Sequence, residues 1–260
     1  MKFEGRTISK GKAKGTVLKL EQPLSFLGGV EGSTGELKVE REGNVAGKIL
    51  VFPRGKGSTV GSFVMYDLMV HDKAPAAVIN ASAETIVATG AVISSIPMID
   101  SVDVDLIHDG DSVTVDADAG TVDIDGVTVI ECASSVVLIG DRFIMLHRPE
   151  KSHSYPDHWS LVAGKREPGE PIERTAAREI FEETGIEVGE PIARMDDLTV
   201  REGDRIWEVH GFAFRVPEGT VPRINGENTE YRMCTLSDLE GVKLVPNTVR
   251  AVKTMVGDLL

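Results

Sequence analysis

Short apolar runs between turn-forming residues predict that the first half of the chain is rich in β-strands. Apolar and polar residues alternate over 15–20, as in a half-buried strand, whereas 47–52 is a continuous apolar run typical of a buried one. The spacing over 63–70 favours a helix. We further predict a strand, a short helix, a strand and a hairpin, over 75–80, 84–90, 96–99 and 110–125. This pattern predicts a compact β-rich domain with a few helices.

The second half has a different pattern. Residues 135–148 alternate about Gly140-Asp141 and predict a hairpin, after which 159–164 leads the chain toward a helix. Pro171 suits the first turn of that helix. Alanines follow, and Gly185 stands where a left-handed cap ends a helix.

Three acidic residues share one face of this predicted helix. Glu179, Glu182 and Glu183 are spaced i, i+3 and i+4, so their like charges repel unless something neutralises them. Taken alone, such a group is usually a solvated acidic surface. A hard divalent cation such as Mg²⁺, which binds carboxylates together with substrate phosphates, is the functional alternative.

The residues around these acids favour the metal-binding interpretation. The stretch from Gly164 resembles the Nudix box, in which a glycine, a glutamate, an Arg-Glu pair, a Glu-Glu pair and a final glycine stand at set spacings. Every fixed position is met: Gly164, Glu170, Arg178, Glu179, Ile180, Glu182, Glu183, Gly185 and Ile186. The resemblance implies an α/β/α sandwich, a divalent metal (Mg²⁺ or Mn²⁺), and hydrolysis of a diphosphate linked to another group.

The resemblance also implies roles for individual residues of the box. The family pattern pairs Glu170 with Arg178, which we interpret as an orienting salt bridge. We expect Glu179, Glu182 and Glu183 to hold the metal, with Glu179 and Glu183 as the principal ligands. Glu182 is the candidate base that activates water. The metal would lower the pKa of its bound water and offset the charge that builds on the phosphate oxygens.

Four residues outside the box have two interpretations each. Glu227 and Glu230 supply either a further metal ligand or base, or two exposed loop acids. Trp159 and Trp207 are expected in the core, with stacking on a substrate as the alternative. The histidines lack the spacing of a zinc site.

A glycine-rich loop follows the buried strand 47–52 and precedes the helix at 63–70. Such a loop is an anion site when backbone N–H groups converge at a helix N-terminus, and Arg54 and Lys56 add positive charge here. A glycine turn capped by Ser58 or Thr59 explains the same residues. The loop sequence alone leaves both interpretations open.

A second resemblance covers nearly all of the N-terminal half. Segments 23–30, 46–62, 84–90 and 96–98 resemble, in order, the small subunits of archaeal phosphomevalonate dehydratases. Those subunits are the detached swivelling domain of the aconitase X family. The resemblance implies that (R)-5-phosphomevalonate loses water to give trans-anhydromevalonate 5-phosphate.

The resemblance further implies a shared active site. A serine of the small subunit accepts the proton; we assign this role to Ser58, with Ser62 as the reserve. A serine needs a lowered pKa for this, which nearby N–H groups and positive charges favour. The [4Fe-4S] cluster is expected on a separate large subunit, forming a heterodimer. The residues expected to bind substrate are Arg54, Gly55, Lys56 and Gly57.

Composition limits the remaining classes of function. The formal charge of −13 argues against generic binding to nucleic acid or anionic membranes. Only Cys132 and Cys234 are present, so the chain has too few cysteines for its own four-cysteine cluster and no disulfide framework is expected. No apolar run approaches the roughly 18 residues of a membrane span. We therefore expect a cytoplasmic protein.

We predict two fused domains, with a boundary near Ile130. Residues 1–130 form a β-rich α/β swivelling domain of the dehydratase small-subunit type, and residues 131–260 form a Nudix α/β/α sandwich. The alternative is a stand-alone Nudix hydrolase of nucleoside or prenyl diphosphates, with the N-terminal domain as a binding or regulatory module. Selectivity in Nudix proteins lies in loops outside the box, so its pattern leaves the substrate open.

Overall fold

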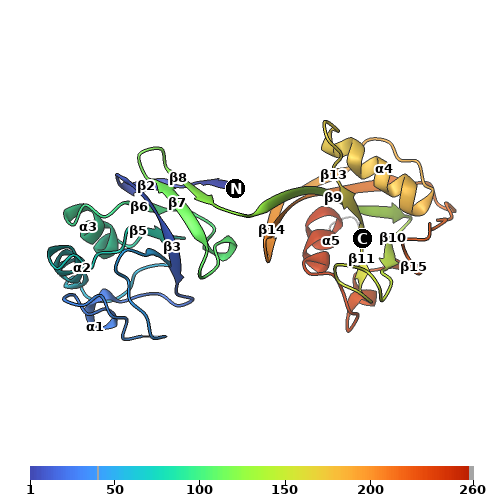
Figure 1. Ribbon diagram of the computed structural model, residues 1–260. Helices are drawn as coiled ribbons and strands as arrows, with labels where there is room; N and C mark the ends of the chain where they lie inside the picture. The colour runs from blue at the N-terminus through green and yellow to red at the C-terminus, as the bar shows by residue number, and fades with distance from the viewer. Residues whose placement is uncertain (40, 258–260) are drawn as a thin grey trace. The chain divides into compact units, whose positions relative to one another are not determined.

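The computed structural model describes residues 1–39 and 41–257 (Figure 1). The chain divides into two compact units, Met1–Thr128 and Val129–Leu260. Each unit has its own sheet and core, and each is described by itself below. Among the described residues, no helix is long and apolar enough to cross a membrane.

The N-terminal unit is built on an eight-stranded sheet with strand order β1-β8-β7-β3-β4-β5-β6-β2. Strands β3, β4, β5 and β6 pair in parallel, as expected for strands joined by helical crossovers, and the other pairs are antiparallel. Its strands are β1 (Lys2–Glu4), β2 (Arg6–Ser9), β3 (Lys12–Lys19), β4 (Ile49–Phe52), β5 (Ala77–Asn80), β6 (Met98–Asp100), β7 (Ser112–Asp116) and β8 (Thr121–Ile124). Its helical segments are α1 (Phe26–Gly29), α2 (Gly61–Val70), α3 (Thr85–Ile93) and the 3₁₀ turn η1 (Val104–Leu106).

Both faces of this sheet are buried. Alternate residues of β4 point to opposite faces, so Leu50 and Phe52 pack with α2 and α3, whereas Ile49 and Val51 pack with the β7–β8 hairpin. Two apolar faces explain why β4 and β5 are continuous apolar runs in the sequence.

The two edge strands of this sheet are neighbours in the sequence. β1 pairs with β8 at one edge, and β2 pairs with β6 at the other. In the sequence, only Gly5 separates β1 from β2. A Cβ atom on Gly5 would lie 2.5 Å from Ile99 and 2.6 Å from the carbonyl oxygen of Asp100. Glycine is therefore the residue that lets the chain pass this closely to β6.

The C-terminal unit contains a seven-stranded sheet covered on both faces by helices. Strands β11, β10, β9, β14 and β13 lie in that order, while β12 pairs with β9 and β15 with β10. The strands are β9 (Thr128–Ile139), β10 (Arg142–His147), β11 (Trp159–Ser160), β12 (Val162–Lys165), β13 (Ala193–Glu202), β14 (Arg205–Val216) and β15 (Glu230–Cys234). The helical segments are α4 (Ile172–Thr184), α5 (Thr248–Val256) and the 3₁₀ turn η2 (Ser237–Leu239).

Alternation along β9 builds this three-layer arrangement. Val136 and Leu138 pack in one cluster with α5, and Val137 packs in the other with Ala176 and Ile180 of α4. Strand β10 alternates in the same way. The predicted α/β sandwich is thus confirmed.

Most of the predicted elements are present with shifted ends. The predicted helix after the glycine-rich loop begins at Gly61 rather than Phe63, and the predicted helix over 84–90 extends to Ile93. Both predicted hairpins form, as β7–β8 and β9–β10. Cys132 and Cys234 are both free and buried.

An ion pair with a buried carboxylate links β2 to β6 in the N-terminal unit. The guanidinium of Arg6 donates from Nε and Nη2 to the carboxylate of Asp100, at 2.9 and 2.6 Å, and the Ala83 N–H donates to the same carboxylate. Asp100 is 1% exposed. The hydrogen bond from Arg6 lowers the pKa of Asp100, against the opposing effect of burial.

Replacing Asp100 with Asn should make stability depend less on pH. With a lowered folded pKa, the carboxylate contributes fully above its ordinary pKa of about 4 and loses that contribution as the pH falls through the lowered value. We expect Asp100→Asn to cost about 1–3 kcal/mol near neutral pH, and the difference from wild type to shrink in acid. Hydrogen exchange of the β6 amides in urea, at neutral and at acid pH, measures the free energy of unfolding of each protein. Asp72→Asn, at an exposed turn, is the control, and an equal loss at all pH values would contradict the prediction.

Candidate functional site

The helix α4 presents the acidic residues of the box toward β12. Pro171 is its N-cap residue, and Gly185 ends it in the left-handed conformation, with φ 67° and its N–H bonded to the Phe181 carbonyl. Ala176 and Ile180 are buried against the sheet. The predicted helix and its glycine cap are confirmed.

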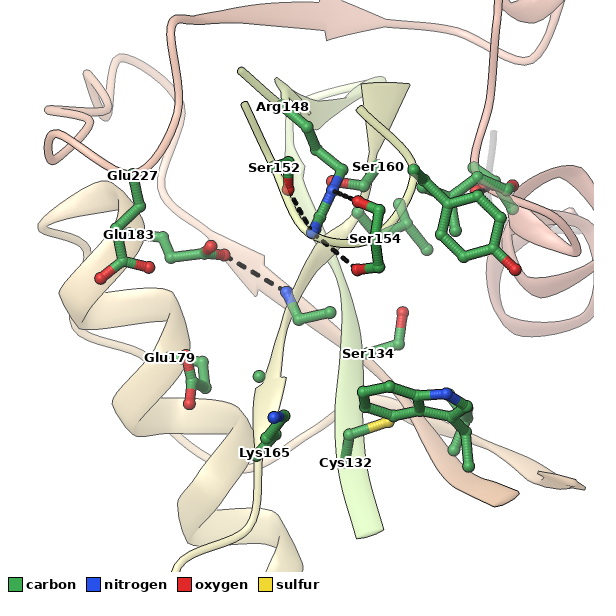
Figure 2. A pocket seen from close by; sticks show the side chains of 18 of the residues that line it. Cys132, Ser134, Arg148, Ser152, Ser154, Ser160, Lys165, Glu179, Glu183 and Glu227 are labelled. Atoms are coloured by element: carbon green, nitrogen blue, oxygen red, sulfur yellow. Dashed lines mark hydrogen bonds between the residues drawn. The ribbon is translucent and has the colours of Figure 1, made fainter. Parts of the chain in front are cut away.

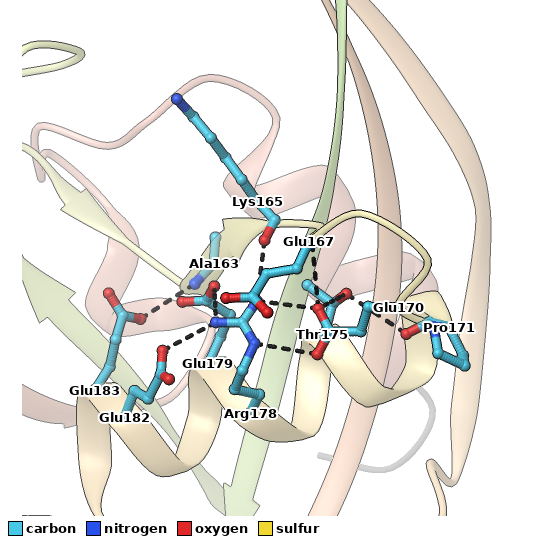
Figure 3. A network of polar contacts seen from close by, with 10 residues as sticks. All are labelled: Ala163, Lys165, Glu167, Glu170, Pro171, Thr175, Arg178, Glu179, Glu182 and Glu183. Atoms are coloured by element: carbon cyan, nitrogen blue, oxygen red, sulfur yellow. Dashed lines mark hydrogen bonds and ion pairs between the residues drawn. The ribbon is translucent and has the colours of Figure 1, made fainter.

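Arg178 is the centre of a polar network on this helix (Figure 3). Its Nε and Nη2 donate to the two carboxylate oxygens of Glu170, at 3.1 and 3.2 Å, and Nη2 also donates to the Lys165 carbonyl. These hydrogen bonds lower the pKa of Glu170 to about 2. The salt bridge expected from the box pattern is present, and it ties the loop before α4 to the helix and to β12.

The three glutamates on the helix have different surroundings. Arg178 Nη1 donates to Glu179 at 2.7 Å and to Glu182 at 2.9 Å. Glu182 is 52% exposed, whereas Glu179 is 13% exposed. Glu183 is buried, where it accepts hydrogen bonds from the Ala163 N–H and the Asn228 side chain, both at 3.2 Å.

Gly164 makes room for Glu179. A Cβ atom on this strand residue would lie 1.8 Å from Cδ of Glu179 and about as close to its two oxygens. The first glycine of the box therefore serves close packing of a carboxylate against β12.

The carboxylates of Glu179 and Glu183 are suited to a nearby cation. Burial raises the pKa of Glu183 to about 7, despite its hydrogen bonds, and burial also raises the pKa of Glu179 despite the charge of Arg178. The charge of Glu227 raises both pKa values further. A hard divalent cation would reverse these effects, and carboxylate oxygens are the donors that Mg²⁺ prefers. The donor set thus fits the metal that the box pattern implies.

The side chains are not gathered into a preformed metal cluster. Within residues 1–39 and 41–257, no group of three or more His, Cys, Asp or Glu side chains is arranged to hold an ion. The guanidinium of Arg178 neutralises part of the acidic charge by pairing with Glu179 and Glu182. The assignment of Glu179, Glu182 and Glu183 as ligands stays a prediction.

A cavity of about 960 Å³ lies beside the acidic face of α4. Figure 2 shows Glu179, Glu183 and Glu227 on one side, Cys132 and Ser134 of β9 across from them, and Lys165 near the base. Strands β13 and β14 add an apolar wall lined by Met195, Leu198, Val200, Trp207 and Val209. The cavity therefore joins an acidic side to an apolar surface.

Several residues of this cavity were missed by sequence reasoning. Trp207 was expected in the core, but it lines the cavity, with Lys165 Nζ 5.6 Å from its ring centroid. Arg148 also lines it, held by Ser152 and Ser154. Trp207 lies on β14, between β9 and β13, and this strand order was not visible in the sequence. Trp159, by contrast, is buried as expected.

Of the two acids outside the box, only Glu227 belongs to the cavity. Glu230 lies on β15, exposed and paired with Arg232. Asn228, between them, was not singled out as a site residue, yet it is buried and donates to Glu183. Its position next to Glu227 was a signal for Asn228 in the sequence, but a neutral amide adds nothing to a pattern of charges.

The glycine-rich loop of the N-terminal unit connects β4 to α2, as the strand–loop–helix pattern predicted. The backbone of Leu24 pairs with the loop on both sides of Gly55. The Leu24 N–H donates to the Arg54 carbonyl, and the Lys56 N–H donates to the Leu24 carbonyl. Gly55 is buried, and a Cβ there would meet Val87 at 2.4 Å. Arg54 and Lys56 are exposed, as a phosphate site requires, and their substrate role stays a prediction.

The two candidate serines differ in access. Ser58 is exposed, and its Oγ accepts a hydrogen bond from the Val60 N–H at 3.3 Å. Ser62 is buried, and its hydroxyl donates to the Thr59 carbonyl at 2.9 Å. The geometry favours Ser58 over Ser62 as a residue that can reach a substrate, because only Ser58 is accessible.

Comparison with known proteins assigns both units to families. Residues 2–124 match the aconitase X swivel domain, and residues 131–254 match the NUDIX domain. The phosphomevalonate dehydratase small subunit of Thermococcus kodakarensis is 57% identical over 128 residues, which are 48% of this chain and 96% of that protein. The chain therefore belongs to the aconitase X swivel-domain family through its N-terminal half, and its C-terminal half is a NUDIX domain.

Solved structures are similar to each half. The crystal structure of Thermococcus kodakaraensis aconitase X (holo-form) is 55% identical, covers 48% of this chain and 98% of its own, and has a TM-score of 0.47. The MutT protein from Methanosarcina mazei Go1 is 24% identical, covers 48% of this chain and 89% of its own, and has a TM-score of 0.41.

Replacing Gly164 with Ala should weaken metal binding while leaving the fold intact. The added methyl group displaces the flexible Glu179 side chain rather than backbone, so we expect little change in the Tm without metal. The rise in Tm that saturating Mn²⁺ produces should shrink, because a ligand is moved. Gly189→Ala, where a Cβ meets nothing within 4 Å, is the control. An undiminished Mn²⁺ effect in Gly164→Ala would contradict the prediction.

Proposed function

We propose that this chain is the small subunit of a phosphomevalonate dehydratase fused to a metal-dependent Nudix diphosphate hydrolase. In the first activity it works with an iron–sulfur large subunit to convert (R)-5-phosphomevalonate to trans-anhydromevalonate 5-phosphate. The observation that carries this is the match of the N-terminal unit to 96% of the length of a protein named as that small subunit. We place the boundary between the two domains of this chain near Ile130, with the dehydratase role on residues 1–130 and the hydrolase on residues 131–260.

In the dehydration, Ser58 removes a proton from carbon. The C–H electron pair forms the double bond, the proton moves to Ser58 Oγ, and the hydroxyl group leaves the neighbouring carbon. The Val60 N–H, which donates to this oxygen, and the positive charges of Arg54 and Lys56 favour the alkoxide that must take the proton. The [4Fe-4S] cluster of the partner would supply the Lewis acid for the leaving hydroxyl group.

In the hydrolysis, Glu182 accepts the proton of the attacking water. Its hydrogen bond to Arg178 orients its carboxylate at the cavity edge, and its exposure keeps it in contact with water. Glu179 and Glu183 would hold a divalent cation, which would offset charge on the phosphate oxygens. The water oxygen bonds to phosphorus, and the bond to the leaving phosphate or phosphate ester breaks.

The alternative, a Nudix hydrolase with a regulatory N-terminal module, has less support. A module that only binds phosphomevalonate would need the substrate loop but not an accessible serine beside it. Here Ser58 is exposed at the end of the loop, while Ser62 is buried. The cavity, with its apolar wall opposite the acids, accepts either a nucleoside or a prenyl group, so a screen of both kinds of diphosphate with Mg²⁺ is the test of substrate class.

Replacing Ser58 with Ala should abolish dehydration by the reconstituted complex. The proton acceptor is then missing, and we expect a loss of at least about a hundredfold in kcat, the scale of a lost general base. Diphosphate hydrolysis by the same protein should be unchanged. Ser62→Ala is the matched control because its hydroxyl is buried. Retained dehydration in Ser58→Ala, or loss only in Ser62→Ala, would show that Ser58 is not the base.

Replacing Glu182 with Gln should give the opposite result. The amide cannot accept the proton of water, so hydrolysis should fall by about a hundredfold or more, with dehydration unaffected. Glu230→Gln, which changes an exposed acid outside the cavity, is the control. Hydrolysis is followed as released phosphate with Mg²⁺ present. Equal rates for wild type and Glu182→Gln would assign the base elsewhere, with Glu227 as the next residue to replace.

A further inference from the structure

Helix α2 is apolar on its exposed face as well as on its buried face. Met65 and Leu68 are buried against the sheet, as an amphipathic helix requires. Yet Phe63 is 68% exposed, Val70 56% and Tyr66 45%. Positions 63, 66 and 70 follow one another at helical spacing, so these side chains form one stripe. A helix that is apolar all round is normally buried on all sides.

The stripe continues to the loop that carries Ser58. Val60, three residues before Phe63, is 45% exposed and stands two residues after Ser58. Leu27, 46% exposed, comes from another segment, and its backbone nitrogen lies 3.9 Å from a Cβ built on Gly61. We call these five residues the α2 face: Leu27, Val60, Phe63, Tyr66 and Val70.

The two helices α2 and α3 carry almost no charge. Asp67 is the one charged residue of α2, and its carboxylate lies 3.2 Å from Nδ1 of His71 at the end of the same helix. Helix α3, which packs beside α2, has no charged residue and exposes Val92 and Ile93. Depletion of charge together with exposed aromatic residues is the composition of the core of a protein–protein interface.

We propose that the α2 face docks the iron–sulfur large subunit of the dehydratase. This rests on the proposed function, which places the cluster on a second chain, in agreement with the two cysteines of this one. The substrate must then lie between that cluster and Ser58, so the partner must cover the surface around Ser58. The α2 face begins two residues from Ser58 and is an apolar surface continuous with it. Docking here buries Phe63 and leaves the loop facing the partner.

Aspartate substitutions on the α2 face test this with the full-length chain. Phe63→Asp and Val70→Asp place a charge in the docked interface, and both side chains are exposed in the free chain, so folding should be retained. Val221→Asp, in the C-terminal unit, is the control, because Val221 is 70% exposed and Phe63 is 68% exposed. The purified large subunit with its cluster intact is the binding partner, and the measurements are its Kd, the dehydration rate and the hydrolysis rate.

We expect Phe63→Asp and Val70→Asp to raise the Kd for the large subunit by about tenfold or more, the effect of losing an interface hot spot. Dehydration should recover when the large subunit is in excess, because Phe63 docks the partner and takes no part in the chemistry. Hydrolysis, and all three measurements for Val221→Asp, should match wild type.

Three outcomes would overturn the proposal. If the wild-type complex dehydrates 5-phosphomevalonate and both α2-face variants bind as tightly as wild type, the large subunit docks elsewhere while the proposed function stands. If sedimentation shows that wild type alone forms a dimer that Phe63→Asp abolishes, the α2 face pairs two copies of this chain. If the wild-type chain and the large subunit neither bind nor dehydrate 5-phosphomevalonate, the proposed function fails as well.

Discussion

The pairing of one guanidinium with several carboxylates is the interaction on which the acidic site depends. Arg178 binds Glu170 through two hydrogen bonds and also contacts Glu179 and Glu182. Without it, four acids of the box would repel one another around one helix face. Because the same guanidinium bonds to the Lys165 carbonyl, it also fixes α4 against β12. The remaining acid of the box, Glu183, is held instead by the Ala163 N–H and the Asn228 side chain.

The two halves of the chain present their chemistry in different ways. The C-terminal unit surrounds its acids with a cavity, so charge, apolar wall and hydrogen-bonding groups come from one unit. The N-terminal unit exposes Ser58, Arg54 and Lys56 on a loop at the start of a helix with an apolar outer face. An accessible loop beside an apolar surface is what a shared active site requires of each contributor.

The elements and the box network were predictable because they rest on local rules. Period and spacing locate β4, α2 and α4, and opposite charges at set positions locate the Glu170–Arg178 pair. The cavity was not predictable in the same way, since Trp207 and Arg148 reach it from β14 and from the loop after β10. Their positions depend on strand order, which no local pattern states. Asn228 is a similar case, because its importance comes from the buried Glu183 it contacts.

The arrangement of β1 and β2 bears on aggregation. A sheet normally leaves two edge strands whose unpaired N–H and C=O groups recruit strands from other molecules. Here both edges of the eight-stranded sheet are occupied by one short, continuous segment that turns at Gly5. Each edge strand is therefore only three or four residues long, too short to template a cross-β stack. The N-terminal unit can thus expose the apolar face of α2 without also exposing a long edge strand that would pair with strands of other molecules.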